Sequence, residues 1–118
     1  LYILNTDYYE KEVKLDELSS KIGEILELIQ QNMFDTCKKR MEAKTTIAHN
    51  LEEFQANMNK EQGFIKAMWC GNEECEAKIK ELTAAKSRCM PFEQEHIGDT
   101  CVCCGKPATK MVIWGRQY

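Results

Sequence analysis

Hydrophobic residues recur at helical spacing through most of the first half of the chain. Five of them follow one another at intervals of three or four residues: Leu18, Ile22, Ile25, Ile29 and Met33. This spacing places them on one face of a helix. Acidic residues precede the stripe and basic residues follow it, as the helix dipole favours. The pattern therefore predicts one long helix from about residue 15 to residue 43, after a strand-like or irregular lead-in over residues 1–15.

The hydrophobic period changes after residue 43, where short strand-like and helix-like segments alternate. We expect strands over residues 45–49, 64–69, 86–90 and 110–114, and helices over residues 50–58 and 73–83. Asn50 with Glu53 forms a capping-box pattern, and Asn72 stands where it can cap the second helix. The order β-α-β-α-β-β favours a two-layer α+β domain with its helices on one face of a small sheet. Residues 115–118 are expected to project from that sheet.

Length and charge narrow the possible functions. The chain has 118 residues, 30% of them charged, and a formal net charge of −3. Because an independent nucleic-acid binder usually carries a dense basic surface, we expect any RNA contact to be one part of a larger surface. No apolar run approaches the ~20 residues of a membrane span, so no membrane partner is expected. The length suits one domain plus a helical arm, and a start at Leu1 leads us to expect a piece of a longer polypeptide.

The second half of the chain contains two cysteine pairs at metal-ligand spacing. Cys70 and Cys75 form a C-x4-C pair, and Cys101 and Cys104 form a C-x2-C pair followed by a glycine. Two such pairs separated by a foldable insert suit a tetrahedral Zn²⁺ site with four thiolate ligands. The glycine, Gly105, tolerates the positive φ that such a turn often requires. Because four thiolates leave no open coordination position, the sequence predicts a structural zinc site.

Other uses of the seven cysteines stay open. The odd number of cysteines, and their confinement to the C-terminal half apart from Cys37, argue against a disulfide scaffold. A redox dithiol would need a βαβ setting that the pattern lacks. Cys103 could replace Cys104 as a ligand, and His96, in the loop before the second pair, could also reach the metal. We interpret Cys37 and Cys89 as small buried apolar residues. Reduced thiols with a metal site lead us to expect a cytoplasmic protein.

The sequence carries no recognisable catalytic motif. It lacks a glycine-rich phosphate loop, a G-x-S-x-G turn, an H-E-x-x-H segment and a kinase signature. Cytidine-deaminase-like chemistry would need a P-C-x-x-C segment, and neither cysteine pair is preceded by proline. The residues by themselves therefore point to a structural role for the metal.

Three segments of the second half combine motifs that occur together in a known family. They are residues 69–76 (WCGNEECE), residues 88–92 (RCMPF) and residues 101–108 (CVCCGKPA), and a terminal Tyr118 follows them. Together they resemble the C-terminal zinc-binding domain of prolyl-tRNA synthetases of the eukaryotic/archaeal type. Residues 25–40 are similar to the segment that joins this domain to the anticodon-binding domain of the same enzymes.

The resemblance implies a division of the chain and a role for five residues. Residues 1–43 would be the lead-in and connecting helix from the anticodon-binding domain, and residues 44–118 would be the C-terminal zinc-binding domain. The family's zinc ligands are matched by Cys70, Cys75, Cys101 and Cys104. Tyr118 matches the family's terminal tyrosine, whose carboxylate is thought to fold back toward the catalytic domain.

The resemblance also implies the activity of a longer protein. The family belongs to the class II aminoacyl-tRNA synthetases, which here join proline to ATP, with Mg²⁺, and transfer the prolyl group to tRNA(Pro). The catalytic core would lie upstream, so this chain would be an accessory, non-catalytic part of a cytoplasmic, homodimeric proline–tRNA ligase. The alternative is an independent zinc-dependent module that binds protein or RNA.

Overall fold

The computed structural model describes residues 2–4, 10–60 and 63–116. The chain divides into two compact units, Leu1–Arg40 and Met41–Tyr118. Among the described residues, no helix is both long enough and apolar enough to cross a membrane.

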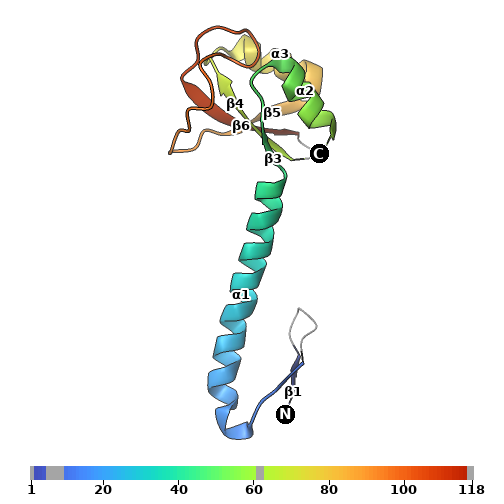
Figure 1. The fold of residues 1–118 in the computed structure, drawn as a ribbon, viewed down its shortest axis with the longest axis vertical. Coiled ribbons are helices and arrows are strands. Elements are labelled where there is room, and N and C mark those ends of the chain that lie inside the picture. The colour runs from blue at the N-terminus through green and yellow to red at the C-terminus, as the bar shows by residue number, and fades with distance from the viewer. Residues whose placement is uncertain (1, 5–9, 61–62, 117–118) are drawn as a thin grey trace. The chain divides into compact units, whose positions relative to one another are not determined.

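The first unit contains a small hairpin and most of a long helix (Figure 1). Strands β1 (Tyr2–Leu4) and β2 (Glu10–Glu12) pair antiparallel. A 3-10 turn at Leu15–Glu17 leads into helix α1, which spans Leu18–Ala43. The predicted long helix is confirmed, although its first turn is 3-10 rather than α.

Several large apolar side chains of α1 are exposed in this chain. Ile25 is the buried residue of α1, whereas Leu26, Met33 and Phe34 are 61%, 61% and 60% exposed. Cys37 is also exposed. The interpretation of Cys37 as a buried apolar residue is therefore wrong for this chain.

The second unit is a four-stranded sheet with two helices (Figure 1). This unit begins with the last residues of α1. Its further elements are β3 (Thr45–Ile47), α2 (Leu51–Lys60), β4 (Phe64–Trp69), α3 (Glu73–Thr83), β5 (Ala85–Cys89) and β6 (Lys110–Arg116). The predicted α+β class and the order β-α-β-α-β-β are confirmed.

The last strand of the chain lies in the middle of the sheet. The strand order is β3-β4-β6-β5, with β3 parallel to β4 and with β6 antiparallel to both β4 and β5. Helices α2 and α3 provide the crossover connections that parallel strands need. Gly63 stands just before β4, where a Cβ atom would lie 2.0 Å from the carbonyl oxygen of Lys44. A residue without a side chain therefore lets the chain enter β4 directly beside β3.

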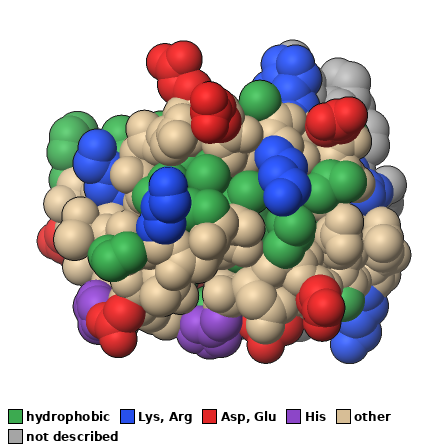
Figure 2. All heavy atoms as spheres, turned by 90° about the horizontal axis from the view of Figure 1, so that it is seen from above, with side chains coloured by type: hydrophobic (Ala, Val, Ile, Leu, Met, Phe, Trp, Pro, Cys, Tyr) green, Lys and Arg blue, Asp and Glu red, His purple; other side chains and the backbone are tan. Residues whose placement is uncertain are grey.

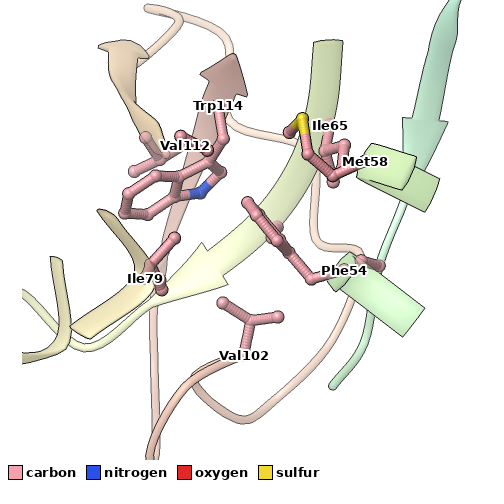
Figure 3. Close-up of a cluster of buried hydrophobic side chains, with 10 residues drawn as sticks. Phe54, Met58, Ile65, Ile79, Val102, Val112 and Trp114 are labelled. Carbon is pink, nitrogen blue, oxygen red and sulfur yellow. The ribbon is translucent and has the colours of Figure 1, made fainter. Parts of the chain in front are cut away.

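One face of the sheet packs against both helices. Trp114 of β6 is fully buried at the centre of this cluster, and the ring of Phe54 from α2 meets it edge-on, with centroids 6.0 Å apart (Figure 3). Ile79 of α3 and Val112 of β6 pack around the same indole. Because full burial of one such side chain is worth about 1.5–3 kcal/mol, this cluster contributes strongly to the stability of the unit.

The opposite face of the sheet is covered at one end by the long connection between β5 and β6. Ile97 packs in a second cluster with Met68 and Met111. The side chain of Gln94 accepts a hydrogen bond from the Met111 backbone N–H at 2.7 Å. This connection therefore returns the chain from the edge strand to the end of β4, where the second cysteine pair lies.

Both helices of the second unit begin at the predicted caps. Asn50 Oδ1 accepts from the Glu53 N–H at 2.8 Å, and Glu53 Oε2 accepts from the His49 N–H at 2.9 Å. Asn72 Oδ1 accepts from the Glu74 N–H at 2.9 Å. Each asparagine thus satisfies an N–H group that the first helical turn leaves without an intrahelical partner.

The predicted end of β6 is wrong. The strand continues through Gly115 and Arg116, because Arg116 pairs with Ala85 of β5 and its side chain donates to the Thr83 carbonyl oxygen at 2.9 Å. Neither residue projects from the sheet. The remaining part of the predicted tail, Gln117 and Tyr118, lies outside the described residues.

The predicted burial of Cys89 is also wrong. Cys89 is exposed. It ends β5, an edge strand, and the register between β5 and β6 shifts between Ser87 and Cys89. An irregular edge strand presents a side chain to solvent where strict alternation would have placed it inward.

Candidate metal centre

The first cysteine pair lies between β4 and α3. β4 ends at Trp69, and Cys70 follows it directly. Gly71 adopts a positive φ of 87°, and Asn72 then caps α3. Cys75 lies in the first turn of α3, where its backbone N–H donates to the Asn72 carbonyl oxygen at 3.1 Å. This local turn brings the sulfur atoms of Cys70 and Cys75 to 3.7 Å.

The second cysteine pair lies in a tight turn before β6. The Cys101 N–H donates to the Lys106 carbonyl oxygen at 2.8 Å, and the Gly105 N–H donates to the Cys101 carbonyl oxygen at 3.0 Å. Gly105 has a φ of 69°, so the predicted positive φ is confirmed. The turn bends Cys104 back toward Cys101, as a glycine in the left-handed region permits.

Long-range backbone contacts fix this turn against the sheet. The Val102 N–H donates to the Met68 carbonyl oxygen of β4 at 2.9 Å. Thr100 and Pro107 form an antiparallel bridge that closes the base of the turn. The second pair is therefore held beside the end of β4, next to the first pair.

The four sulfur atoms lie close enough to share one metal ion. All four Sγ atoms, from Cys70, Cys75, Cys101 and Cys104, lie within 4.8 Å of one another. Cys70 Sγ is 3.7 Å from both Cys75 Sγ and Cys104 Sγ. Tetrahedral zinc with Zn–S bonds of about 2.3 Å requires sulfur–sulfur edges of about 3.8 Å. A disulfide requires about 2.05 Å, and all seven cysteines are free thiols. The cluster therefore fits the size of a four-thiolate metal site.

Hydrogen bonds and burial give the thiols unequal acidity. The Lys106 backbone N–H donates to the sulfur of Cys104 and lowers the pKa of that thiol to about 7. Burial raises the pKa of Cys75, and the neighbouring sulfur of Cys104 raises it further. The Asn72 backbone N–H lowers the pKa of Cys70, but burial and the sulfurs of the second pair outweigh it, so that this pKa is raised overall. A bound cation favours the thiolate form of every ligand.

The other candidate ligands do not join the cluster. Cys103 is half-buried, and its side chain packs against both hydrophobic clusters. His96 Nε2 lies 2.9 Å from Asp99 Oδ1, where both side chains are well exposed. The substitution of Cys103 for Cys104, which the spacing left open, is therefore not the arrangement in this structure.

Sequence reasoning missed the two backbone amides that donate to sulfur. They belong to Asn72 and Lys106, and each lies two residues after the cysteine that accepts its hydrogen bond. In both cases the intervening residue is a glycine with positive φ, Gly71 or Gly105. The repeated Cys-Gly step in the sequence was the signal that could have revealed them. Two similar turns thus face each other across the cluster.

The arrangement suits the binding of a metal but not a reaction at it. All four donors are thiols, and four protein ligands close a tetrahedral zinc site to water and substrate. A metal here would cross-link the end of β4, the first turn of α3 and the turn before β6.

Comparison with known proteins finds a matching family model and similar sequences. Residues 51–118 match a family model described as "Prolyl-tRNA synthetase, C-terminal". A proline–tRNA ligase of Clostridium botulinum (strain Okra / Type B1) is 54% identical over 106 residues, which cover 90% of this chain and 22% of that relative. A proline–tRNA ligase of Lachnoclostridium phytofermentans is 52% identical over 117 residues, covering 98% of this chain and 24% of that relative.

A solved structure agrees with the sequence relatives. The crystal structure of a prolyl-tRNA synthetase from Cryptosporidium parvum, complexed with L-proline and AMP, matches with a TM-score of 0.84 and 29% identity. The match covers 94% of this chain and 24% of that one. The chain thus spans about a quarter or less of the length of these relatives.

Proposed function

Since the chain belongs to the prolyl-tRNA synthetase family and corresponds to its C-terminal region, we propose that it is the zinc-binding accessory domain of a proline–tRNA ligase. The observation that carries the proposal is the cluster of four sulfur atoms within 4.8 Å of one another, formed by residues of the matched region. The proposed ligands of Zn²⁺ are Cys70, Cys75, Cys101 and Cys104.

Zinc is the proposed metal because of the donor set. Soft thiolate ligands in a tetrahedral arrangement select Zn²⁺ or iron–sulfur chemistry over hard cations such as Mg²⁺ or Ca²⁺. The sulfur–sulfur distances of 3.7 Å agree with the edge of a mononuclear zinc–thiolate tetrahedron. When bound, the ion supplies a cross-link between segments more than 25 residues apart in sequence, and we assign it no part in the chemistry of aminoacylation.

The proposed activity belongs to the longer protein. There, a catalytic domain outside this chain would activate proline with ATP and Mg²⁺ and transfer the prolyl group to tRNA(Pro). Residues 1–43 would connect the zinc-binding domain, residues 44–118, to an anticodon-binding domain. The terminal carboxylate of Tyr118 would reach toward the catalytic domain. We expect this enzyme to be a cytoplasmic homodimer.

Contact with tRNA is proposed for the whole enzyme rather than for this chain alone. The net charge of the chain is −3, and lysine, arginine and acidic side chains are interspersed with hydrophobic ones over the face drawn in Figure 2. A mixed surface of this kind lacks the dense positive charge that drives independent binding to phosphates.

The zinc content of cysteine variants tests the proposal. The purified chain is expected to contain about one zinc ion, and Cys104→Ser is expected to lower zinc content sharply, because it removes one ligand of a closed site. Cys103→Ser is the matched control, since it changes the adjacent thiol, which lies outside the cluster. Elemental analysis after gel filtration measures both. Loss of zinc from Cys103→Ser, with unchanged content in Cys104→Ser, would show that the ligand set is wrong.

A further inference from the structure

A tryptophan of the sheet is hydrogen-bonded to the turn that holds the first cysteine pair. The indole Nε1–H of Trp69 donates to the backbone carbonyl oxygen of Asn72 at 3.1 Å. The same carbonyl oxygen accepts from the Cys75 N–H at 3.1 Å, and Asn72 follows Cys70 by only two residues. The Asn72 peptide group therefore links the indole to the short turn that carries both cysteines of the pair.

The indole is itself held by the folded core. Trp69 is the last residue of β4, and its ring packs against both hydrophobic clusters. It meets the fully buried ring of Trp114 edge-on, with centroids 6.5 Å apart at an angle of 87°. A half-buried ring held in this way cannot move far. Its N–H therefore fixes the position and orientation of the Asn72 carbonyl group.

We propose that Trp69 is a positioning residue for the metal site, because its indole N–H holds the Asn72 peptide in the orientation that aims Cys70 and Cys75 at one ion. Groups that orient metal ligands from outside the coordination sphere affect metal affinity although they do not touch the metal. The hydrogen bond from Trp69 does not contact a ligand side chain; it contacts the backbone segment between the two proposed ligands, Cys70 and Cys75. This inference rests on the proposed zinc site.

The core supplies a matched control for this hydrogen bond. Trp114 lies in the same cluster, and its buried indole Nε1 has no hydrogen-bond partner among the described residues. Trp69→Phe and Trp114→Phe remove the same atoms from neighbouring rings. Only the first substitution removes a hydrogen bond that leads to the cysteines.

Release of zinc to an excess of the chelator 4-(2-pyridylazo)resorcinol is the first test. Trp69→Phe is expected to release zinc about threefold to tenfold faster than the wild-type chain, which is the effect of one typical hydrogen bond. Trp114→Phe leaves this hydrogen bond in place and keeps an aromatic ring against Trp69, so it is expected to raise the release rate less than Trp69→Phe does. The Co²⁺-loaded Trp69→Phe chain is expected to show altered ligand-field bands, which report ligand geometry. Equal release rates for the two variants, or a wild-type rate for Trp69→Phe, would overturn the proposal.

The wild-type chain supplies a second test that requires no variant to fold. If the indole hydrogen bond favours metal binding, then metal binding favours that hydrogen bond by the same factor. Removal of zinc is therefore expected to raise the hydrogen-exchange rate of the Trp69 indole N–H about threefold or more, relative to that of Trp114, in NMR spectra. An unchanged ratio of the two rates would refute the role of Trp69. If the wild-type chain bound no zinc or cobalt at all, the proposed metal site itself would be wrong, which is a distinct outcome.

Discussion

At the scale of single residues, Gly23 and Gly105 both have free space around them, but only Gly105 adopts a positive φ. A Cβ atom on Gly23 or on Gly105 would meet nothing within 4 Å. Gly23 lies inside α1, where any L-residue fits, whereas Gly105 has a φ of 69° in the second cysteine turn. Free space therefore does not decide the effect of a substitution at these positions, and backbone conformation does.

Alanine substitutions at these two glycines are expected to change stability in opposite directions. Gly105→Ala should lower the free energy of unfolding by about 1–2 kcal/mol, because alanine is strained in the left-handed region. Gly23→Ala should stabilise α1 by about 1 kcal/mol, because glycine is a poor helix former. Denaturant titration followed by circular dichroism measures both. Gly105→Asn, which tolerates positive φ better, should fall between wild type and Gly105→Ala, and the reverse order would contradict this account.

The thiols of the metal-free chain are expected to react at unequal rates. The pKa of Cys104 is lowered to about 7 by the Lys106 N–H, so its thiolate should be abundant above pH 7 and should vanish as pH falls below it. Because the thiolate is the nucleophile, alkylation of Cys104 by iodoacetamide should become much faster between pH 5 and pH 8. Cys75 has a raised pKa and is buried, so it should react more slowly than Cys104. Peptide mass spectrometry measures both rates, and equal labelling of Cys75 and Cys104 at pH 7 would show that the thiols do not differ in this way.

At the scale of elements, the two helices of the second unit begin in the same way, but only α3 carries a cysteine of the sulfur cluster in its first turn. Asn50 caps α2 and Asn72 caps α3, each through one side-chain hydrogen bond to a backbone N–H. The first turn of α3 contains Cys75, which belongs to the sulfur cluster. The first turn of α2 contains no member of that cluster. Removal of the cap of α3 should therefore weaken metal binding, whereas removal of the cap of α2 should not.

Alanine substitutions at the two caps are expected to separate helix stability from metal binding. Asn50→Ala and Asn72→Ala should each lower the free energy of unfolding by about 1 kcal/mol, the usual value of an N-cap. Asn72→Ala should in addition weaken zinc binding in competition with a chelator, because fraying of α3 displaces Cys75. Zinc affinity in Asn50→Ala should match wild type. Equal zinc affinities in the two variants would indicate that the cap of α3 does not help to place its ligand.

At the scale of the whole molecule, the chain contains a cluster of four thiols that could hold a metal ion, and it spans only a small part of the length of its relatives. It spans 22% and 24% of the proline–tRNA ligases of Clostridium botulinum and Lachnoclostridium phytofermentans. The sequence carries no phosphate-binding motif, and the four thiols of the cluster leave no open position on a tetrahedral metal. These features support the proposal that the chemistry occurs elsewhere in the longer protein.

The purified chain is expected to be inactive in proline-dependent exchange between ATP and pyrophosphate. The reason is that residues able to bind ATP and proline would lie in the upstream catalytic domain. The full-length protein should show the exchange under the same conditions and serves as the positive control. Proline-dependent exchange by this chain alone, at a rate that survives repurification, would refute the accessory role.

Much of the fold could be predicted because its determinants are close together in sequence. The bounds of β4 and α3 follow from a buried run, a glycine and an asparagine cap within 21 residues (63–83). The long α1 follows from its stripe, and the order of elements gives the α+β class. The predictions that failed concern residues whose environment depends on distant segments. Cys89 lies beside a bulge at a sheet edge, and Gly115 and Arg116 extend β6 because β5 pairs with them.

The sequence by itself determined the helices, the approximate positions of the four strands of the sheet and the four cysteines at ligand spacing, because periodicity, capping and short-range spacing act within a few residues. The tertiary structure alone decided that β6 lies between β4 and β5, that Cys103 packs into the core instead of joining the sulfur cluster, and that the Trp69 indole reaches the Asn72 carbonyl group. The first two outcomes depend on packing and hydrogen bonding between surfaces that meet only when the sheet has formed. The third joins residues only three apart in sequence, but the Trp69 ring also packs edge-on against Trp114 of β6. A linear pattern contains the groups involved but not the distances between them.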